Sequence, residues 1–304
     1  KRRFRPTRPR PDLHAMPVHP LHDHPAFTSE FCEREYNNLA RIPDHPTYTA
    51  RWAADGALAR RTQGAQLGLP YGQAPAETLD YFPPRKPGAP LLVFIHGGYW
   101  RALNKSDFSW IAPAYVARGA AVAIVDYGLA PATPIEEIVR QMLRAHAWLY
   151  LHAAELGFDA RRIVTSGHSA GGQLTAMMLA ARWQAWSAGL PPDLVSGGLA
   201  LSGLYDLEPV AKAPFLADLE LTPARVDALS PAYFVPERRT PLIAAVGASE
   251  TDEFRRQNRL IAACWPRNVR RTLEVPDCHH LDICDRLADP GQELFAAACE
   301  LLGL

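Results

Sequence analysis

The sequence of 304 residues predicts an α/β fold in which a mostly parallel central sheet carries helices on both faces. Two observations lead to this prediction. Short apolar runs of strand type alternate along the chain with longer helical stretches, as in sheets whose parallel strands are joined by helices. Two glycine-rich segments directly follow predicted strands, at the sheet edge where such folds place their binding residues.

The expected elements follow a tail and loop at residues 1–25. Helical patterning spans 31–61 with breaks at Pro43 and Pro46, and two short extended runs occupy parts of 65–82. The main strands are expected at 91–95, 121–126, 162–167, 197–203, 241–247 and 272–275. Helices are expected at 135–155, from Ala170 onward, at 254–264 and at 292–302.

The domain organisation expected from this pattern is simple. Residues 204–236 are irregular and interrupted by prolines, which indicates an insertion over the sheet rather than part of it. We therefore expect a single domain over residues 26–304, with small cap elements near 30–61 and 204–236.

Composition narrows the classes of function. Hydrophobic residues make up 48% and charged residues 21% of the chain, and the formal net charge is zero. This balance gives no strong field toward nucleic acid or a membrane surface, and no run of about 18 apolar residues occurs. Five cysteines without paired spacing indicate free thiols in a reducing compartment. We expect a cytoplasmic protein that acts on a small molecule. Its oligomeric state is left undecided between monomer and homodimer.

The first residues differ from the rest of the chain. Residues 1–11 contain six basic and no acidic residues, which leaves 26 basic and 32 acidic residues elsewhere. Prolines exclude a helix there, so we expect a solvated tail that chemistry does not need, with a nucleic-acid tag as the alternative. His19, His22 and His24 have a spacing that could bind a metal, but prolines surround them. We expect no metal and no cofactor.

The segment GHSAGG at 167–172 carries the strongest chemical signal. Gly167-His168-Ser169-Ala170-Gly171 fits G-x-S-x-G, and it lies between a predicted strand and a predicted helix. This strand–turn–helix setting is typical of the nucleophile elbow of an α/β-hydrolase fold. The alternative for Ser169 is a simple helix N-cap. We predict that Ser169 is a nucleophile.

A serine nucleophile needs a base and an acid, which this fold takes from later in the chain. His279 and His280 both follow the last predicted strand, and their surroundings in the sequence barely separate them. Glu250 and Asp252 follow the strand at 241–247, and Asp206 is a weaker third candidate for the acid.

The segment HGGYW at 96–100 follows the strand at 91–95, where such hydrolases form their oxyanion hole. We expect the backbone N–H groups of Gly98, Tyr99 and Ala170 to hold the oxyanion. Aromatic and imidazole side chains near these motifs are candidates for contact with the substrate, although aromatic residues more often pack in the core. These candidates are Tyr99, Trp100, His168 and Tyr205.

The motifs HGGYW, DYGLAP at 126–131 and GHSAGG together resemble the kynurenine formamidase (arylformamidase) branch of the α/β-hydrolases. That branch is related to the hormone-sensitive-lipase-like esterases, which carry HGGG where this chain has HGGY. The segments at 202–207 and 249–257 also resemble it. The resemblance places the triad acid at Glu250 and the base at His280. This chain departs from that branch in having Glu as the acid and Leu281 after the histidine.

The resemblance implies a cofactor-free serine hydrolase that cleaves an N-formyl or N-acyl arylamine such as N-formylkynurenine. Hydrolysis of short-chain or aryl esters is the alternative. A third hypothesis, a hydrolase fold retained only for binding, is disfavoured because the nucleophile, base and oxyanion segments are all present.

Overall fold

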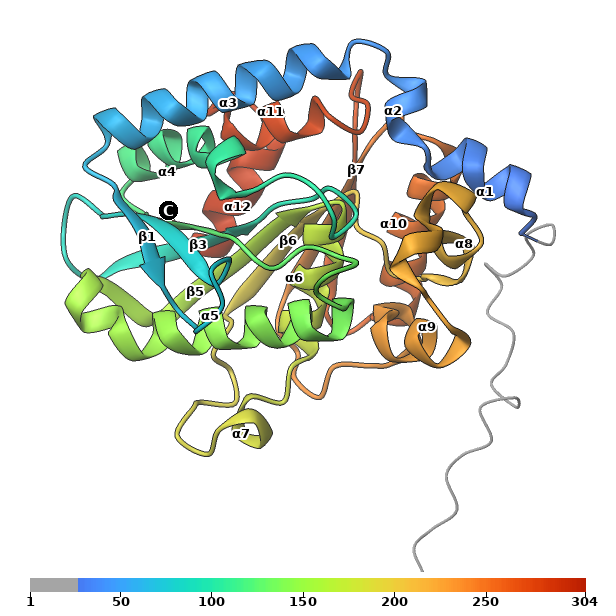
Figure 1. Ribbon diagram of the computed structural model, residues 1–304. Coiled ribbons are helices and arrows are strands. Elements are labelled where there is room, and N and C mark those ends of the chain that lie inside the picture. The colour runs from blue at the N-terminus through green and yellow to red at the C-terminus, as the bar shows by residue number, and fades with distance from the viewer. Residues whose placement is uncertain (1–26) are drawn as a thin grey trace, which may run out of the picture.

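The computed structural model describes residues 27–304, and its centre is an eight-stranded sheet between two layers of helices (Figure 1). The basic tail at 1–11 and the three histidines at 19–24 lie outside the described residues. The strands are β1 (Gln66–Pro70), β2 (Thr78–Phe82), β3 (Ala89–Ile95), β4 (Ala121–Val125), β5 (Phe158–His168), β6 (Gly197–Leu201), β7 (Leu242–Gly247) and β8 (Val269–Val275). Their order in the sheet is β1-β2-β4-β3-β5-β6-β7-β8.

The pairing confirms the mostly parallel sheet. Neighbours from β4 through β3, β5, β6 and β7 to β8 are parallel, and only the pairs β1–β2 and β2–β4 are antiparallel. The carboxyl ends of β3, β5, β6 and β7 therefore meet at one edge. The residues that directly follow these strands form the site described below.

Strand β3 shows why the apolar runs are continuous rather than alternating. Leu91, Val93 and Ile95 enter one hydrophobic core, whereas Leu92 and Phe94 enter the core on the opposite face of the sheet. A strand covered on both faces needs an apolar side chain at every position.

The helices and short 3-10 turns (η) cover these two faces and occupy the segment 204–236. They are α1 (Ser29–Tyr36), α2 (Asn38–Arg41), α3 (His45–Thr62), η3 (Lys105–Asp107), η4 (Ser109–Ile111), α4 (Ala112–Arg118), α5 (Ile135–Leu156), α6 (Ala170–Ala180), α7 (Trp183–Trp186), α8 (Glu208–Ala211), η5 (Pro214–Leu219), α9 (Pro223–Leu229), η6 (Pro231–Tyr233), α10 (Asp252–Cys264), α11 (Ile283–Ala288) and α12 (Glu293–Leu302). Helices α5 and α6 cover one face of the sheet, and α3, α4, α11 and α12 cover the other (Figure 1).

Most predicted elements match, and the differences are local. Helix α5 spans the predicted helix and ends at Gly157, which has a positive φ of 81°. Pro46 does not break a helix, because it stands in the first turn of α3, where a proline is tolerated. Helices α4 and α11 were not predicted. Segment 204–236 contains α8, η5, α9 and η6, and α8 and α9 lie with α1 beside α10 (Figure 1).

Candidate active site

Ser169 lies in a sharp turn between β5 and α6. Its backbone has φ 57° and ψ −116°, a conformation that a residue with a side chain rarely adopts. The flanking glycines make this turn possible. A Cβ at Gly167 would collide with the carbonyl of Gly171, and a Cβ at Gly171 would collide with the carbonyl of Ile95. The structure therefore gives Ser169 the strained strand–turn–helix geometry of a nucleophile elbow.

Ser169 lines a cavity of about 410 Å³. His168, Gly98, Tyr99 and His280 line the same cavity. The rest of the wall is apolar in large part and consists of Asn37, Asn38, Leu39, His45, Thr49, Trp52, Arg101, Ala102, Leu103, Phe215 and Leu281. A cavity of this size is in the range of small-molecule sites. Five of the residues predicted from separate motifs thus meet in one place.

His280 and Glu250 form a buried pair beside Ser169. The His280 Nδ1 atom lies 2.6 Å from Glu250 Oε2. The other carboxylate oxygen of Glu250 accepts hydrogen bonds from the Ser202 hydroxyl at 2.5 Å and from the Gly247 N–H at 2.7 Å. The carboxylate is therefore held at both oxygens, and an Nδ1–H tautomer of His280 leaves Nε2 free to accept a proton.

The alternatives for these two roles are placed elsewhere. The Nδ1 atom of His279 accepts hydrogen bonds from the backbone N–H groups of Leu281 and Asp282, which use this ring to shape the turn. The Asp252 side chain is 86% exposed and pairs with Arg255. Asp206 is buried but pairs with Arg256. Of the three candidates for the acid, only Glu250 contacts one of the two candidate bases, His280.

The HGGYW loop supplies donors on the other side of Ser169. Gly98, Tyr99 and Trp100 have positive φ angles of 97°, 50° and 58°, so the chain turns with a left-handed twist here. Within residues 27–304, no carbonyl or side chain accepts the N–H groups of Gly98, Tyr99 and Ala170. Ala170 is the first residue of α6, where a helix has no internal acceptor for its N–H groups. These three groups are the free donors that an oxyanion hole requires.

A partly buried cluster behind this loop holds its position, and the sequence motifs alone did not reveal it. The Tyr127 hydroxyl donates to the His96 carbonyl at 2.9 Å, and the His96 ring stacks on the Tyr127 ring at 4.2 Å. The Nε2 atom of His96 lies 3.3 Å from Asp126 Oδ1, and Lys105 Nζ lies 3.3 Å from Asp126 Oδ2. Burial alone would raise the pKa of Asp126, but contacts with His96 and Lys105 hold that pKa below its usual value.

The predicted substrate-contact residues separate into two groups. Tyr99 and His168 line the cavity, and burial together with the nearby His280 holds the pKa of His168 well below its usual value. Trp100 and Tyr205 are 0% exposed and line no part of this cavity, so the structure places both in the core. The Trp100 Nε1–H donates to Gln173 at 3.2 Å, which turns the indole away from the site. The motif position of Trp100 and the aromatic character of Tyr205 favour contact with the substrate, but neither side chain reaches this cavity.

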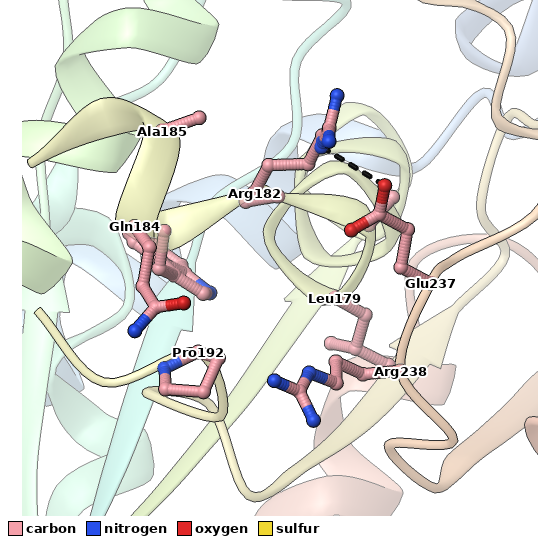
Figure 2. A pocket seen from close by; sticks show the side chains of 10 residues that line it. Leu179, Arg182, Gln184, Ala185, Pro192, Glu237 and Arg238 are labelled. Atoms are coloured by element: carbon pink, nitrogen blue, oxygen red, sulfur yellow. Dashed lines mark ion pairs between the residues drawn. The ribbon is translucent and has the colours of Figure 1, made fainter. Parts of the chain in front are cut away.

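A depression of about 470 Å³ beside α3, lined by Arg51, Trp110 and Asp285 among others, contains none of the predicted site residues. A smaller depression of about 130 Å³ is lined by Leu179, Pro192 and Arg238 among others, and none of the predicted site residues lines it (Figure 2). Arg182 and Glu237 pair across it at 3.0 Å and are largely exposed. Over residues 27–304, no group of three metal-binding side chains is found. In the same part of the chain, no helix is long and apolar enough to cross a membrane.

Comparisons with known proteins agree with this geometry. The family model for the α/β-hydrolase fold matches residues 92–264, which is more than half of the chain. A kynurenine formamidase of Salmo salar is 30% identical over 250 residues, covering 78% of this chain and 82% of the relative. The carboxylesterase NlhH of Mycobacterium tuberculosis is 31% identical over 144 residues, covering 41% of this chain and 45% of the relative.

A solved structure extends the similarity to the whole described fold. A protein of Silicibacter sp. TM1040, provisionally described as a thioesterase, superposes with a TM-score of 0.75 at 31% identity. The match covers 87% of this chain and 97% of that protein. The elbow, the sheet order and these relatives lead to the same conclusion: the chain belongs to the α/β-hydrolase family.

Proposed function

We propose that this protein is a serine hydrolase that cleaves an N-formyl or N-acyl arylamine through an acyl-enzyme, with Ser169, His280 and Glu250 as its triad. The buried contact between His280 and Glu250, in the wall of the cavity that Ser169 lines, carries this proposal. The similarity to kynurenine formamidases over most of the chain favours an amide as substrate, with N-formylkynurenine as the leading candidate.

In the first half of the reaction, Ser169 Oγ attacks the acyl carbonyl while His280 Nε2 takes the hydroxyl proton. Glu250 orients the imidazole and stabilises its charged form. The N–H groups of Gly98, Tyr99 and Ala170 donate to the oxyanion of the tetrahedral intermediate. The carbon–nitrogen bond then breaks, and His280 transfers its proton to the departing arylamine.

In the second half, water replaces the amine in the cavity. His280 removes a proton from this water, which attacks the acyl carbon of the acyl-enzyme. The bond to Ser169 Oγ breaks, the serine recovers its proton from His280, and the acyl group leaves as a carboxylic acid. Apart from the substrate and water, every group in these two half-reactions belongs to the chain itself.

The test compares N-formylkynurenine with a series of p-nitrophenyl esters, using Ser169→Ala as the control for both. We expect a higher kcat/KM for the formamide and a loss of about 10⁶-fold in kcat for the variant. A fully active Ser169→Ala enzyme would refute the mechanism. Rapid ester turnover without formamide turnover would favour the carboxylesterase alternative, which the similarity to NlhH supports.

Acyl length provides a second test. The Tyr99 ring lines the cavity, its hydroxyl donates to the Tyr36 carbonyl at 2.6 Å, and it packs edge-on against Phe215 at 5.6 Å. A ring held at both ends limits the space beside the oxyanion, so we expect a small acyl group. Across formyl, acetyl, butyryl and octanoyl derivatives of one arylamine, kcat/KM should fall, because one ill-fitting methylene changes discrimination by about 10-fold or more. A steady rise toward octanoyl would contradict this.

A further inference from the structure

Two neighbouring asparagines line the cavity, and the fold uses only one of them. The Asn37 side-chain oxygen accepts the Ala40 N–H at 3.2 Å and caps α2. The Asn37 side-chain nitrogen donates to Glu33 at 2.9 Å. Both ends of this carboxamide therefore serve the local structure, which accounts for the residue without any ligand.

Asn38 has no such role. Its side chain lines the cavity, and the residue is only 6% exposed. Within residues 27–304, its Nδ2 atom is buried without an acceptor. Leaving a buried polar group unpaired costs free energy. A carboxamide kept at this cost beside a cavity points to a partner that arrives with the substrate.

The position of Asn38 relative to the catalytic base supports this. A second cavity of about 250 Å³ is lined by Asn38, Arg41, Ile42, Ser249, Glu250, Thr251, His279 and His280. Asn38 and His280 are the two residues that line both cavities. The wall of the larger cavity is apolar in large part, whereas every residue that lines the smaller one except Ile42 carries a polar side chain. Asn38 therefore marks the boundary at which a polar substituent of an aryl substrate would leave the apolar region.

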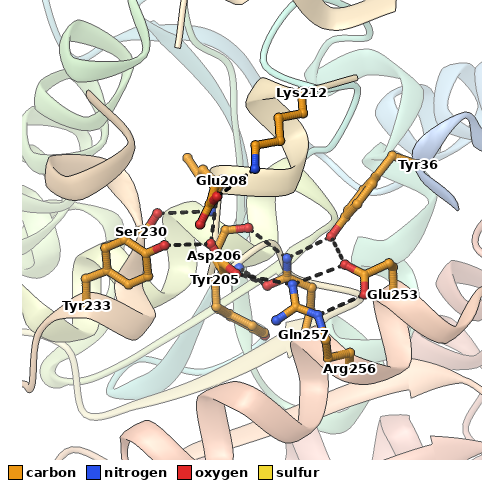
Figure 3. A network of polar contacts seen from close by, with 11 residues as sticks. Tyr36, Tyr205, Asp206, Glu208, Lys212, Ser230, Tyr233, Glu253, Arg256 and Gln257 are labelled. Atoms are coloured by element: carbon orange, nitrogen blue, oxygen red, sulfur yellow. Dashed lines mark hydrogen bonds and ion pairs between the residues drawn. The ribbon is translucent and has the colours of Figure 1, made fainter. Parts of the chain in front are cut away.

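The segment that carries Asn38 is held rigidly against the site. The Tyr36 hydroxyl donates to Glu253 at 2.7 Å and accepts from Gln257 at 3.0 Å (Figure 3). The Tyr36 carbonyl accepts from the Tyr99 hydroxyl at 2.6 Å, and the Glu35 carbonyl accepts from the Thr251 hydroxyl at 2.9 Å. Asn38 follows two residues after this anchor. Its carboxamide is thus pre-positioned, as specificity contacts need to be.

We propose that the Asn38 carboxamide hydrogen-bonds a polar substituent on the aryl group of the substrate, and so selects substituted aryl substrates over plain ones. The inference rests on the proposed function, because it assumes that an aryl amide or ester occupies the cavity. The carboxamide nitrogen can donate to the ketone oxygen of a ring substituent, and the carboxamide oxygen can accept from a substituent amine. Aryl substrates with either kind of substituent belong to the class that Asn38 would recognise.

The experiment measures kcat/KM for formanilide, for its ortho-acetyl derivative and for its ortho-aminomethyl derivative. The enzymes are the wild type, Asn38→Leu, and the matched control Asn258→Leu. Asn258 is also a buried asparagine, 2% exposed, and its Oδ1 atom has no partner among the described residues, but it lines neither cavity. It therefore controls for the general effect of removing an unpaired buried amide.

We expect the wild type to prefer one of the substituted formanilides by about 10-fold or more. In Asn38→Leu this preference should fall to about the intrinsic ratio of the uncatalysed substrates, because kcat/KM should drop more for the preferred derivative than for plain formanilide. Asn258→Leu should keep the wild-type preference. An unchanged preference in Asn38→Leu, or no preference in the wild type, would overturn the inference.

A second variant and the activity of the wild type separate failure of the Asn38 assignment from failure of folding or of the proposed function. If Asn38→Leu does not fold, Asn38→Asp replaces it, because an acceptor-only side chain should shift the preference from the ketone toward the amine. If the wild type hydrolyses none of the three formanilides, the proposed function itself fails. If it hydrolyses all three with equal efficiency, the function stands and the assignment of Asn38 fails.

Discussion

Glu250 and Glu253 lie three residues apart, and both side chains are 0% exposed, yet they belong to different kinds of site. Glu250 contacts the imidazole ring of His280, and both residues line the smaller cavity. Glu253 accepts two hydrogen bonds from Arg256, at 2.9 and 3.1 Å, and Arg256 also reaches Asp206 at 3.2 Å (Figure 3). The first carboxylate can respond to a proton on its partner, whereas the second compensates a permanent charge.

The comparison shows that burial and ionic contacts alone do not identify catalytic residues. The Glu253–Arg256–Asp206 cluster joins α10 to the start of the cap, and the Tyr233 hydroxyl adds a contact to Asp206 at 2.9 Å. None of these residues lines the cavity of Ser169. Access to the cavity and a partner that can change protonation state distinguish the candidate triad from this structural cluster.

The largest expected effect comes from Glu250→Gln. The change removes the charge that stabilises the imidazolium form of His280, so kcat/KM should fall by about 10⁴-fold. The unfolding free energy, measured in urea, should fall less than that of Glu253→Gln, because the partner of Glu253 carries a permanent charge. Asp252→Asn is the matched control and should stay within about twofold of the wild type, because its side chain is 86% exposed. A reversed order of these two variants would assign the acid to Asp252.

Glu253→Gln should show the opposite pattern. Removing one partner of a buried charged cluster leaves Arg256 incompletely paired, so the unfolding free energy should fall by about 3 kcal/mol. The fraction that remains folded should keep kcat/KM within about tenfold of the wild type. Urea unfolding followed by circular dichroism, together with activity at low urea, measures both quantities. A catalytic loss equal to that of Glu250→Gln, at unchanged stability, would remove the distinction between the two sites.

A pair of glycines extends the contrast to the oxyanion loop. Gly98 and Gly119 have similar φ angles of 97° and 99°, but a Cβ at Gly98 would collide with the Ala102 carbonyl, whereas one at Gly119 meets nothing within 4 Å. Gly98→Ala should lower kcat/KM by about 10²-fold because it displaces an oxyanion donor. Gly119→Ala should cost about 1 kcal/mol of stability and leave turnover unchanged. Equal effects on turnover would argue against a role for the Gly98 N–H.

The smallest expected effect concerns a buried histidine far from the catalytic pair. His146 hydrogen-bonds the Met142 carbonyl and the Thr165 hydroxyl, both at 2.8 Å. Burial lowers the pKa of His146 from 6.5 to about 4. Between these two pH values the imidazole is therefore protonated in the unfolded chain and neutral in the folded protein. The stability due to this group is complete above pH 6.5 and declines as pH falls toward 4.

The measurement compares urea unfolding of the wild type and His146→Gln at several pH values. Between pH 7 and 5 the wild type should lose about 1–2 kcal/mol more than the variant, since each full proton taken up changes stability by about 1.4 kcal/mol per pH unit. Parallel curves for the two proteins would show that His146 does not titrate in this way.

The sequence predicted those parts of the site that depend on local structure. The elbow at Ser169 and the loop at Gly98 are set by strand ends and by glycines whose Cβ would collide with backbone, and such patterns can be read directly. The choice between His279 and His280 could not be made locally, because it depends on how the turn after β8 faces β7. The resemblance to a family supplied that choice, and the observed contact with Glu250 agrees with it.

The burial of Trp100 and the position of Asn38 at the cavity could not be predicted from the neighbouring sequence. Trp100 directly follows Tyr99, yet its ring is fully buried and donates to Gln173, while Tyr99 lines the cavity. Asn38 lies more than 100 residues before Ser169 in the chain, and nothing in its surroundings predicts that α1 is anchored to Thr251 and Tyr99. Contacts between distant segments decide both cases, and a single sequence does not report them.

The most direct test of the central claim is covalent labelling with a small aryl phosphonate, followed by intact mass and peptide mapping. The proposed mechanism predicts one phosphonyl group per chain on Ser169, fast labelling of Glu253→Gln and slow labelling of Glu250→Gln, because only Glu250 supports the base that activates the serine. Label on another residue, or equal labelling rates for the two glutamate variants, would contradict the assignment of Ser169, His280 and Glu250 as the catalytic triad.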